Sequence, residues 1–173
     1  MFHWIGKIFL RVILLGILTI VIFLGLANFT FKSAIAVVTK IEEIPGEILY
    51  RSQTKLDDQS GKVWQVVLFK QVYPGEATTI NLRLVGFPGT AELIHPQPLK
   101  ITSDTGKVWN AADVFLDEAP APTIGQYDFT KILPQLPPES LNLAIPLPGL
   151  KSINLSVPVH VVKEWKSLIT NDH

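Results

Sequence analysis

The chain has 173 residues, and its 15 Lys and Arg side chains balance its 15 Asp and Glu side chains. This balance, without any basic cluster, argues against a nucleic-acid partner. The chain contains no cysteine, which excludes thiol catalysis, cysteine-ligated zinc and disulfide support. No motif predicts a cofactor.

The N-terminal part of the chain predicts export. Residues 12–27 form an apolar run without a charge, and Lys7 and Arg11 precede it. The triplet Ala34-Ile35-Ala36, with small residues at its first and third positions, follows shortly after. This order is typical of a secretory signal peptide that is cleaved after Ala36.

An uncleaved membrane anchor is the second interpretation. Residues 12–31 would form a helix of about 30 Å, which is long enough to span a bilayer. Both interpretations divide the chain into residues 1–36 and an exported domain of residues 37–173, on the non-cytoplasmic side. Without residues 1–36, the chain keeps 12 basic and 15 acidic side chains, a net charge of −3.

A central β-hairpin is the clearest structural prediction. Residues 47–56 alternate as a half-buried strand does, and residues 62–72 continue the pattern with Trp64, Val66 and Leu68 on one face. Residues 73–76, Tyr-Pro-Gly-Glu, predict a type II turn. Residues 77–86 then return as a third strand.

Shorter elements follow this hairpin. Gly86-Phe87-Pro88-Gly89 predicts a tight turn, with extended pieces at 91–94 and 98–103 after it. The words Gly-Lys-Val-Trp at 61–64 and 106–109 are identical and each follows an aspartate and a turn. They indicate either an ancient duplication or chance reuse of a favourable turn.

The second half of the chain is rich in proline. Residues 110–140 are expected to form a long connection, with one helical turn from Asp128 to Pro134. Late strands are predicted at 141–147 and 151–157. Residues 158–169 predict an amphipathic helix that lies on a sheet face. The expected fold is therefore mainly β, a single antiparallel sandwich or open barrel with a C-terminal helix.

Several segments resemble a known family. The stretch from Arg83 to Leu93, with Gly-Phe-Pro-Gly at its centre, is the most specific, and residues 95–99, 125–128 and 161–165 fit the same pattern. The chain resembles small exported cyanobacterial proteins classed as a domain of unknown function, over roughly residues 40–168. The resemblance implies a cyanobacterial source, and hence the periplasm or the thylakoid lumen as destination. It brings no activity and no catalytic residues.

Two places are candidates for interaction. Arg83 lies mid-strand on the polar side of the hairpin, where its planar guanidinium group could bind a carboxylate of a ligand or partner. A structural ion pair of Arg83 with Asp128 or Glu92 is the alternative. Phe87, beside Pro88 in the tight turn, is expected to be exposed and to offer a partner contact.

His95 is the histidine with the most informative position, just before a proline. It is either a structural loop residue or, in a hydrolase, part of a pocket in which His95 or Arg83 meets Asp128 or Glu92. No two histidines have the spacing of a zinc site. The acidic pairs 57–58 and 117–118 are expected to be solvated turn residues.

The sequence leaves three functions open. The first is a non-catalytic accessory or interaction protein of the periplasm or thylakoid lumen, which binds membrane-complex subunits through loops such as 86–98 and 118–138. The second is a carrier of a small apolar ligand such as a lipid or pigment. The third is an extracytoplasmic hydrolase. The membrane itself is a further partner through residues 12–31 if the signal is not cleaved.

Overall fold

The computed structural model describes residues 39–44, 47–116, 118–149 and 151–170, together with Gly16. The chain divides into two units, Met1–Ser33 and Ala34–His173, and the fold described below belongs to the second. The predicted export segment lies outside the described residues except for Gly16. Among the residues that are described, no helix is long and apolar enough to cross a membrane.

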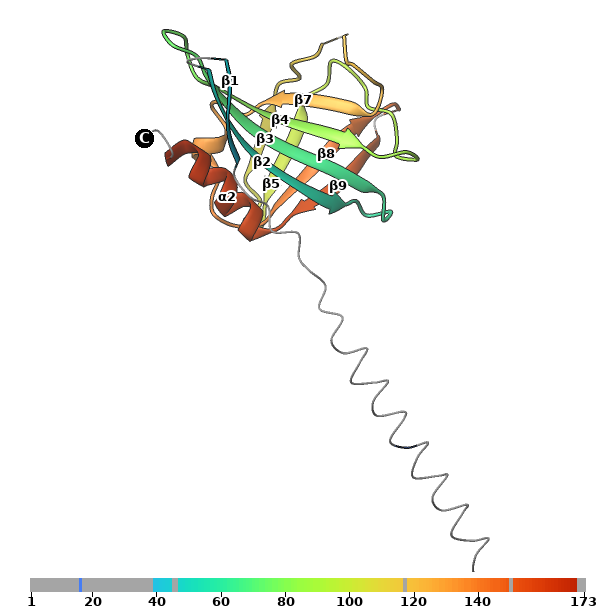
Figure 1. The fold of residues 1–173 in the computed structure, drawn as a ribbon. Helices are drawn as coiled ribbons and strands as arrows, with labels where there is room; N and C mark the ends of the chain where they lie inside the picture. The colour runs from blue at the N-terminus through green and yellow to red at the C-terminus, as the bar shows by residue number, and fades with distance from the viewer. Residues whose placement is uncertain (1–15, 17–38, 45–46, 117, 150, 171–173) are drawn as a thin grey trace, which may run out of the picture. The chain divides into compact units, whose positions relative to one another are not determined.

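Two antiparallel sheets make up the described part of the chain, which confirms the mainly β class (Figure 1). The first sheet has the order β1-β2-β3-β4-β7, and the second has the order β6-β5-β8-β9. The strands of the first sheet are β1 (Thr39–Ile44), β2 (Glu47–Asp57), β3 (Val63–Val72), β4 (Thr79–Gly86) and β7 (Ile124–Asp128). The strands of the second are β5 (Leu99–Ser103), β6 (Val108–Ala111), β8 (Leu141–Leu147) and β9 (Lys151–Val157).

The predicted central hairpin is confirmed. Alternate residues of β3 and β4 point into the core, because successive side chains of a strand face opposite sides of the sheet. The fully or nearly buried members are Trp64, Val66, Leu68, Ile80, Leu82 and Leu84. The β3–β4 turn is closed by a 3.2 Å hydrogen bond from the Glu76 N–H to the Tyr73 carbonyl, and Gly75 has a φ of +82°.

The two Gly-Lys-Val-Trp sequences belong to turns of the same kind in different sheets. In the β2–β3 turn the N–H of Gly61 donates to the Asp58 carbonyl, and in the β5–β6 turn that of Gly106 donates to the Ser103 carbonyl, both at 2.9 Å. Both glycines have a positive φ, +73° and +83°, which residues other than glycine rarely adopt. Asp58 and Ser103 therefore occupy equivalent places.

The edges of the two sheets are joined by short bridges. Asp58, after β2, bridges Leu155 of β9, and Asp113, after β6, bridges Tyr127 of β7. Around the second bridge the N–H of Val114 donates to the Gln126 carbonyl at 2.8 Å. The bridges are isolated pairs, so the sheets face each other without forming one closed barrel.

The C-terminal helix α2 (Val159–Thr170) begins and ends one residue later than predicted. It buries one apolar stripe, as expected, and contacts β2 and the 3₁₀ helix η1 (Leu133–Gln135). The ring of Trp165 lies edge-on to Phe129, 6.2 Å between centroids. The buried ammonium group of Lys70 on β3 donates to the Leu168 carbonyl at 3.2 Å, which ties the helix end to the first sheet.

The prediction of a long connection over 110–140 is wrong in part. β6 reaches Ala111, and β7 pairs with β4 as an integral strand of the first sheet. The predicted helical turn from Asp128 is also displaced, because the 3₁₀ helix spans only Leu133–Gln135. The late strands β8 and β9 have the predicted bounds, whereas residues 91–94 form no strand.

Candidate functional site

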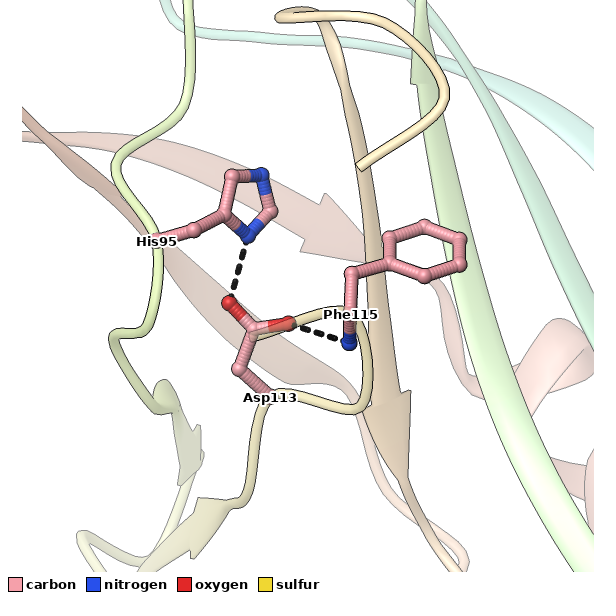
Figure 2. Close-up of polar contacts among 3 residues, drawn as sticks. All are labelled: His95, Asp113 and Phe115. Atoms are coloured by element: carbon pink, nitrogen blue, oxygen red, sulfur yellow. Dashed lines mark hydrogen bonds and ion pairs between the residues drawn. The ribbon is translucent and has the colours of Figure 1, made fainter. Parts of the chain in front are cut away.

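The loop after β4 carries a short hydrogen bond between a histidine and an aspartate. Nδ1 of His95 lies 2.6 Å from Oδ2 of Asp113, and their side chains are 11% and 3% exposed (Figure 2). Since a carboxylate only accepts hydrogen bonds, Nδ1 is the donor of this pair. The pair fastens the loop to the segment that joins the two sheets.

Asp113 is held from both sides. Its Oδ1 accepts a 3.1 Å hydrogen bond from the N–H of Phe115, and the Phe115 ring lies edge-on to His95 with centroids 6.5 Å apart (Figure 2). Nε2 of His95 is buried and has no hydrogen-bond partner among the described residues. This nitrogen therefore meets no hydroxyl nucleophile in the described part of the chain.

Tyr127 lies beside Asp113 and is fully buried. Burial raises the pKa of its hydroxyl above the ordinary value, and the charge of Asp113 raises this pKa further. The Tyr127 side chain also explains a glycine two residues earlier. A Cβ at Gly125 would lie 2.8 Å from the Tyr127 hydroxyl and 2.7 Å from Leu93 Cδ2, so only glycine fits without a shift.

Phe115 connects this pair to Arg83 on the outer face of the first sheet. The Arg83 guanidinium carbon lies 5.9 Å from the centroid of the Phe115 ring and 5.4 Å from that of Phe69. Its Nε and Nη2 donate to Oε1 of Gln126 at 2.9 and 2.6 Å. We call Arg83, Gln126, Phe69 and Phe115 the Arg83 cluster. Two rings and one amide thus orient one guanidinium group.

The Arg83 cluster borders an open groove of about 370 Å³ on the outer face of the first sheet. Strands β2, β3 and β4 line this groove, with Arg51 on one side and Arg83 on the other. Val67 and Phe69 of β3 lie between the two arginines in the sheet. Among the described side chains that line the groove, none is acidic and two are arginines, so this lining carries positive charge.

The predicted turn at Phe87 and Pro88 has the expected geometry. The N–H of Thr90 donates to the Phe87 carbonyl at 3.0 Å, and Gly89 has a φ of +89°. Phe87 is 36% exposed, and Nζ of Lys55 lies 5.2 Å from the centroid of its ring. Phe87 is thus available at the surface, as the sequence predicted.

The other predicted site residues do not gather in one place. Glu92 is exposed on the loop, and Asp128 is exposed at the end of β7 with its Oδ1 accepting from the Thr130 N–H at 2.8 Å. The carboxylate expected beside Arg83 is replaced by the amide of Gln126, and the partner of His95 is Asp113.

Four residues of the site, Asp113, Gln126, Phe69 and Phe115, were not predicted from the sequence. One local signal existed for Asp113, because a carboxylate that bonds the N–H two residues later is typical of an Asx turn. The prediction that Asp58 is a solvated turn residue is wrong. Its side chain is buried and accepts hydrogen bonds from Trp64 and two backbone N–H groups.

Within the described ranges, no group of three or more His, Asp or Glu side chains is placed to hold a metal ion. The fold and the groove define a small two-sheet β module with a preformed basic surface site. The chain belongs to the family DUF3122, described as proteins of unknown function, whose pattern matches residues 36–168. No curated protein and no solved structure matches the chain.

Proposed function

We propose that this protein is a non-catalytic accessory or interaction protein on the non-cytoplasmic side of a membrane, in the periplasm or thylakoid lumen of a cyanobacterium. It binds a subunit of a membrane complex. The apolar run at 12–27 with basic residues before it supports this location. The observation that carries the binding role is the open groove with an arginine already oriented at its edge.

The preformed Arg83 cluster supports binding because a partner need not immobilise this side chain itself. Ordering a long side chain on association costs about 0.5–1.5 kcal/mol. In this protein Gln126 and two aromatic rings already restrict the guanidinium group. The exposed side chains of Phe87 and Leu116, 36% and 59% accessible, extend the proposed surface onto the neighbouring loops.

The packing favours this role over a carrier of an apolar ligand. A carrier needs space between its sheets, whereas large side chains occupy the interior here. Among the side chains with no exposed surface are Trp64, Tyr127, Phe129 and Trp165. The geometry also favours binding over hydrolysis, since the free ring nitrogen of His95 is shielded from solvent.

Cross-linking in native membranes tests the proposal. The full chain with a C-terminal tag is expressed in its own host, cross-linked, solubilised and purified, and its partners are quantified by mass spectrometry. We expect a membrane protein joined to residues around the groove, and less of it with Arg83→Gln. Recovery of the tagged chain alone, or a tag located on the cytosolic side, would contradict the proposal.

A further inference from the structure

The groove on the outer face of the first sheet holds both arginines that follow residue 36. Arg51 on β2 pairs with Phe69 of β3, and Arg83 on β4 pairs with Val67 of β3. The two arginines are thus separated by two strand spacings across the sheet and by two residues along it. These offsets, roughly 10 Å and 7 Å, place their Cα atoms about 12 Å apart.

Arg83 has hydrogen-bonding capacity left for a ligand. A guanidinium group has five N–H donors, and Gln126 takes two of them, from Nε and Nη2. Three donors remain on a group whose plane is held by Phe69 and Phe115. A fixed planar fork of donors matches the two oxygens of a carboxylate.

We infer that the groove binds an extended acidic segment of the protein partner, with two carboxylates four residues apart. This inference rests on the proposed function and names the chemistry of its partner. Residues i and i+4 of an extended chain are about 13–14 Å apart and face the same side. Their carboxylates reach Arg51 and Arg83, while an apolar residue at i+2 lies over Val67 and Phe69 of the groove.

The rest of the lining favours a peptide. Gln53, Gln65 and Gln71 supply amides that both donate and accept hydrogen bonds, as a peptide backbone requires. None of the described side chains that line the groove is a lysine, and two positive charges are too few for binding along a phosphate backbone. The groove is open to solvent, whereas sites for small molecules usually enclose most of the ligand.

Fluorescence anisotropy with the full chain in neutral detergent tests the inference. The probe is the labelled peptide Glu-Gln-Leu-Gln-Glu with blocked ends. One control peptide replaces both Glu by Gln, and a second, Glu-Glu-Leu-Gln-Gln, keeps the charge but changes the spacing. We expect the probe to bind more tightly than both controls, and its affinity to fall as salt is added.

Three variants locate the binding. Arg83→Gln removes the oriented donors, and Gln126→Glu keeps the side-chain shape but places a competing carboxylate on Arg83. Each should weaken probe binding about tenfold or more. Lys100→Gln removes one positive charge from a different groove, on the second sheet, and should change binding less than about twofold.

Circular dichroism and urea midpoints verify that each variant is folded. Folded Arg83→Gln and Gln126→Glu proteins that bind the probe like the wild type would overturn the inference, as would equal binding of all three peptides. Such a result would not contradict the proposed function, since a partner can bind the Phe87 and Leu116 surface instead. Peptide binding to the groove without any cross-linked partner in membranes would instead count against the proposed function.

Discussion

The indole Nε1 of Trp64 donates a 3.0 Å hydrogen bond to Oδ2 of Asp58, and both side chains are buried. The other carboxylate oxygen accepts from the N–H groups of Ser60 and Lys62 at 2.7 and 3.0 Å. One carboxylate therefore orders the β2–β3 turn and attaches it to the core. It does so where Asp58 also bridges Leu155 of the second sheet.

Replacing this carboxylate should destabilise the fold. Asp58→Asn offers one acceptor oxygen instead of two and turns an NH₂ group toward an existing donor. We expect the free energy of unfolding to fall by about 1–3 kcal/mol, measured by urea denaturation. Asp57→Asn is the matched control, because Asp57 is exposed, and it should change stability by less than about 0.5 kcal/mol. Equal midpoints for the two variants would contradict this role.

The same carboxylate predicts a pH dependence. Burial raises the pKa of Asp58, but the hydrogen bonds from Trp64, Lys62 and Ser60 and the charge of Lys62 lower this pKa more, to below the ordinary 3.8. Because the pKa is lower in the folded protein, the stabilisation is complete above the unfolded-state value and is lost as the pH falls through the folded-state value. The difference in Tm between wild type and Asp58→Asn should therefore narrow below about pH 4. A difference that is constant down to about pH 2 would argue against this origin.

The equivalent turn in the second sheet lacks the carboxylate. Ser103 occupies the place of Asp58, and Nε1 of Trp109 is buried without a hydrogen-bond partner among the described residues. Ser103→Asp should supply this partner and raise the free energy of unfolding by about 1 kcal/mol. The test is made with Glu139→Gln, because Glu139 bonds Thr105 in the same turn and would repel the new charge. Thermal melts that show no gain over Ser103→Ala in this background would refute the prediction.

Replacing Asp113 should destabilise the fold more than replacing Asp128, an exposed aspartate at the end of β7. Asp113→Ala removes the acceptor of both His95 and the Phe115 N–H, and should cost about 1–3 kcal/mol in urea unfolding. Limited proteolysis should also become faster in the loop 87–98, which this pair fastens. Asp128→Ala is the control, since its carboxylate is exposed and accepts from Thr130 in a local turn. A smaller loss for Asp113→Ala than for Asp128→Ala would show that the pair does not hold the loop.

Elements that bury one face through regular alternation were predictable. β3 and β4 place every second side chain in the core, and a Pro-Gly turn separates them. The C-terminal helix was predictable for a similar reason, because its apolar residues have helical spacing. β7 was not predictable in this way. Its five residues include Gly125 and the buried Gln126, so the strand lacks the alternation of a half-buried strand.

The candidate site was predictable only at the level of single residues. Arg83, Phe87 and His95 were identified because each has an unusual side chain for its place in a strand or turn. Their partners were not, because the hydrogen bonds of His95 and Arg83 cross 18 and 43 residues of sequence. The Gly-Lys-Val-Trp repeat indicated two similar turns. It did not indicate that a carboxylate accepts a hydrogen bond from the tryptophan in the first copy and that the tryptophan of the second copy has no such partner among the described residues.

The mainly β class, the central hairpin and the C-terminal helix could be predicted from the residues alone, because they depend on apolar spacing and turn chemistry within a few positions. The contact of Asp113 with His95, and the hydrogen bonds by which Gln126 orients Arg83 beside a basic groove, became visible only in the folded chain. Those contacts follow from how β7 pairs with β4 and how the segment after β6 bridges to β7. Strand pairing over such separations is set by the packing of the whole core, which no short stretch of residues encodes.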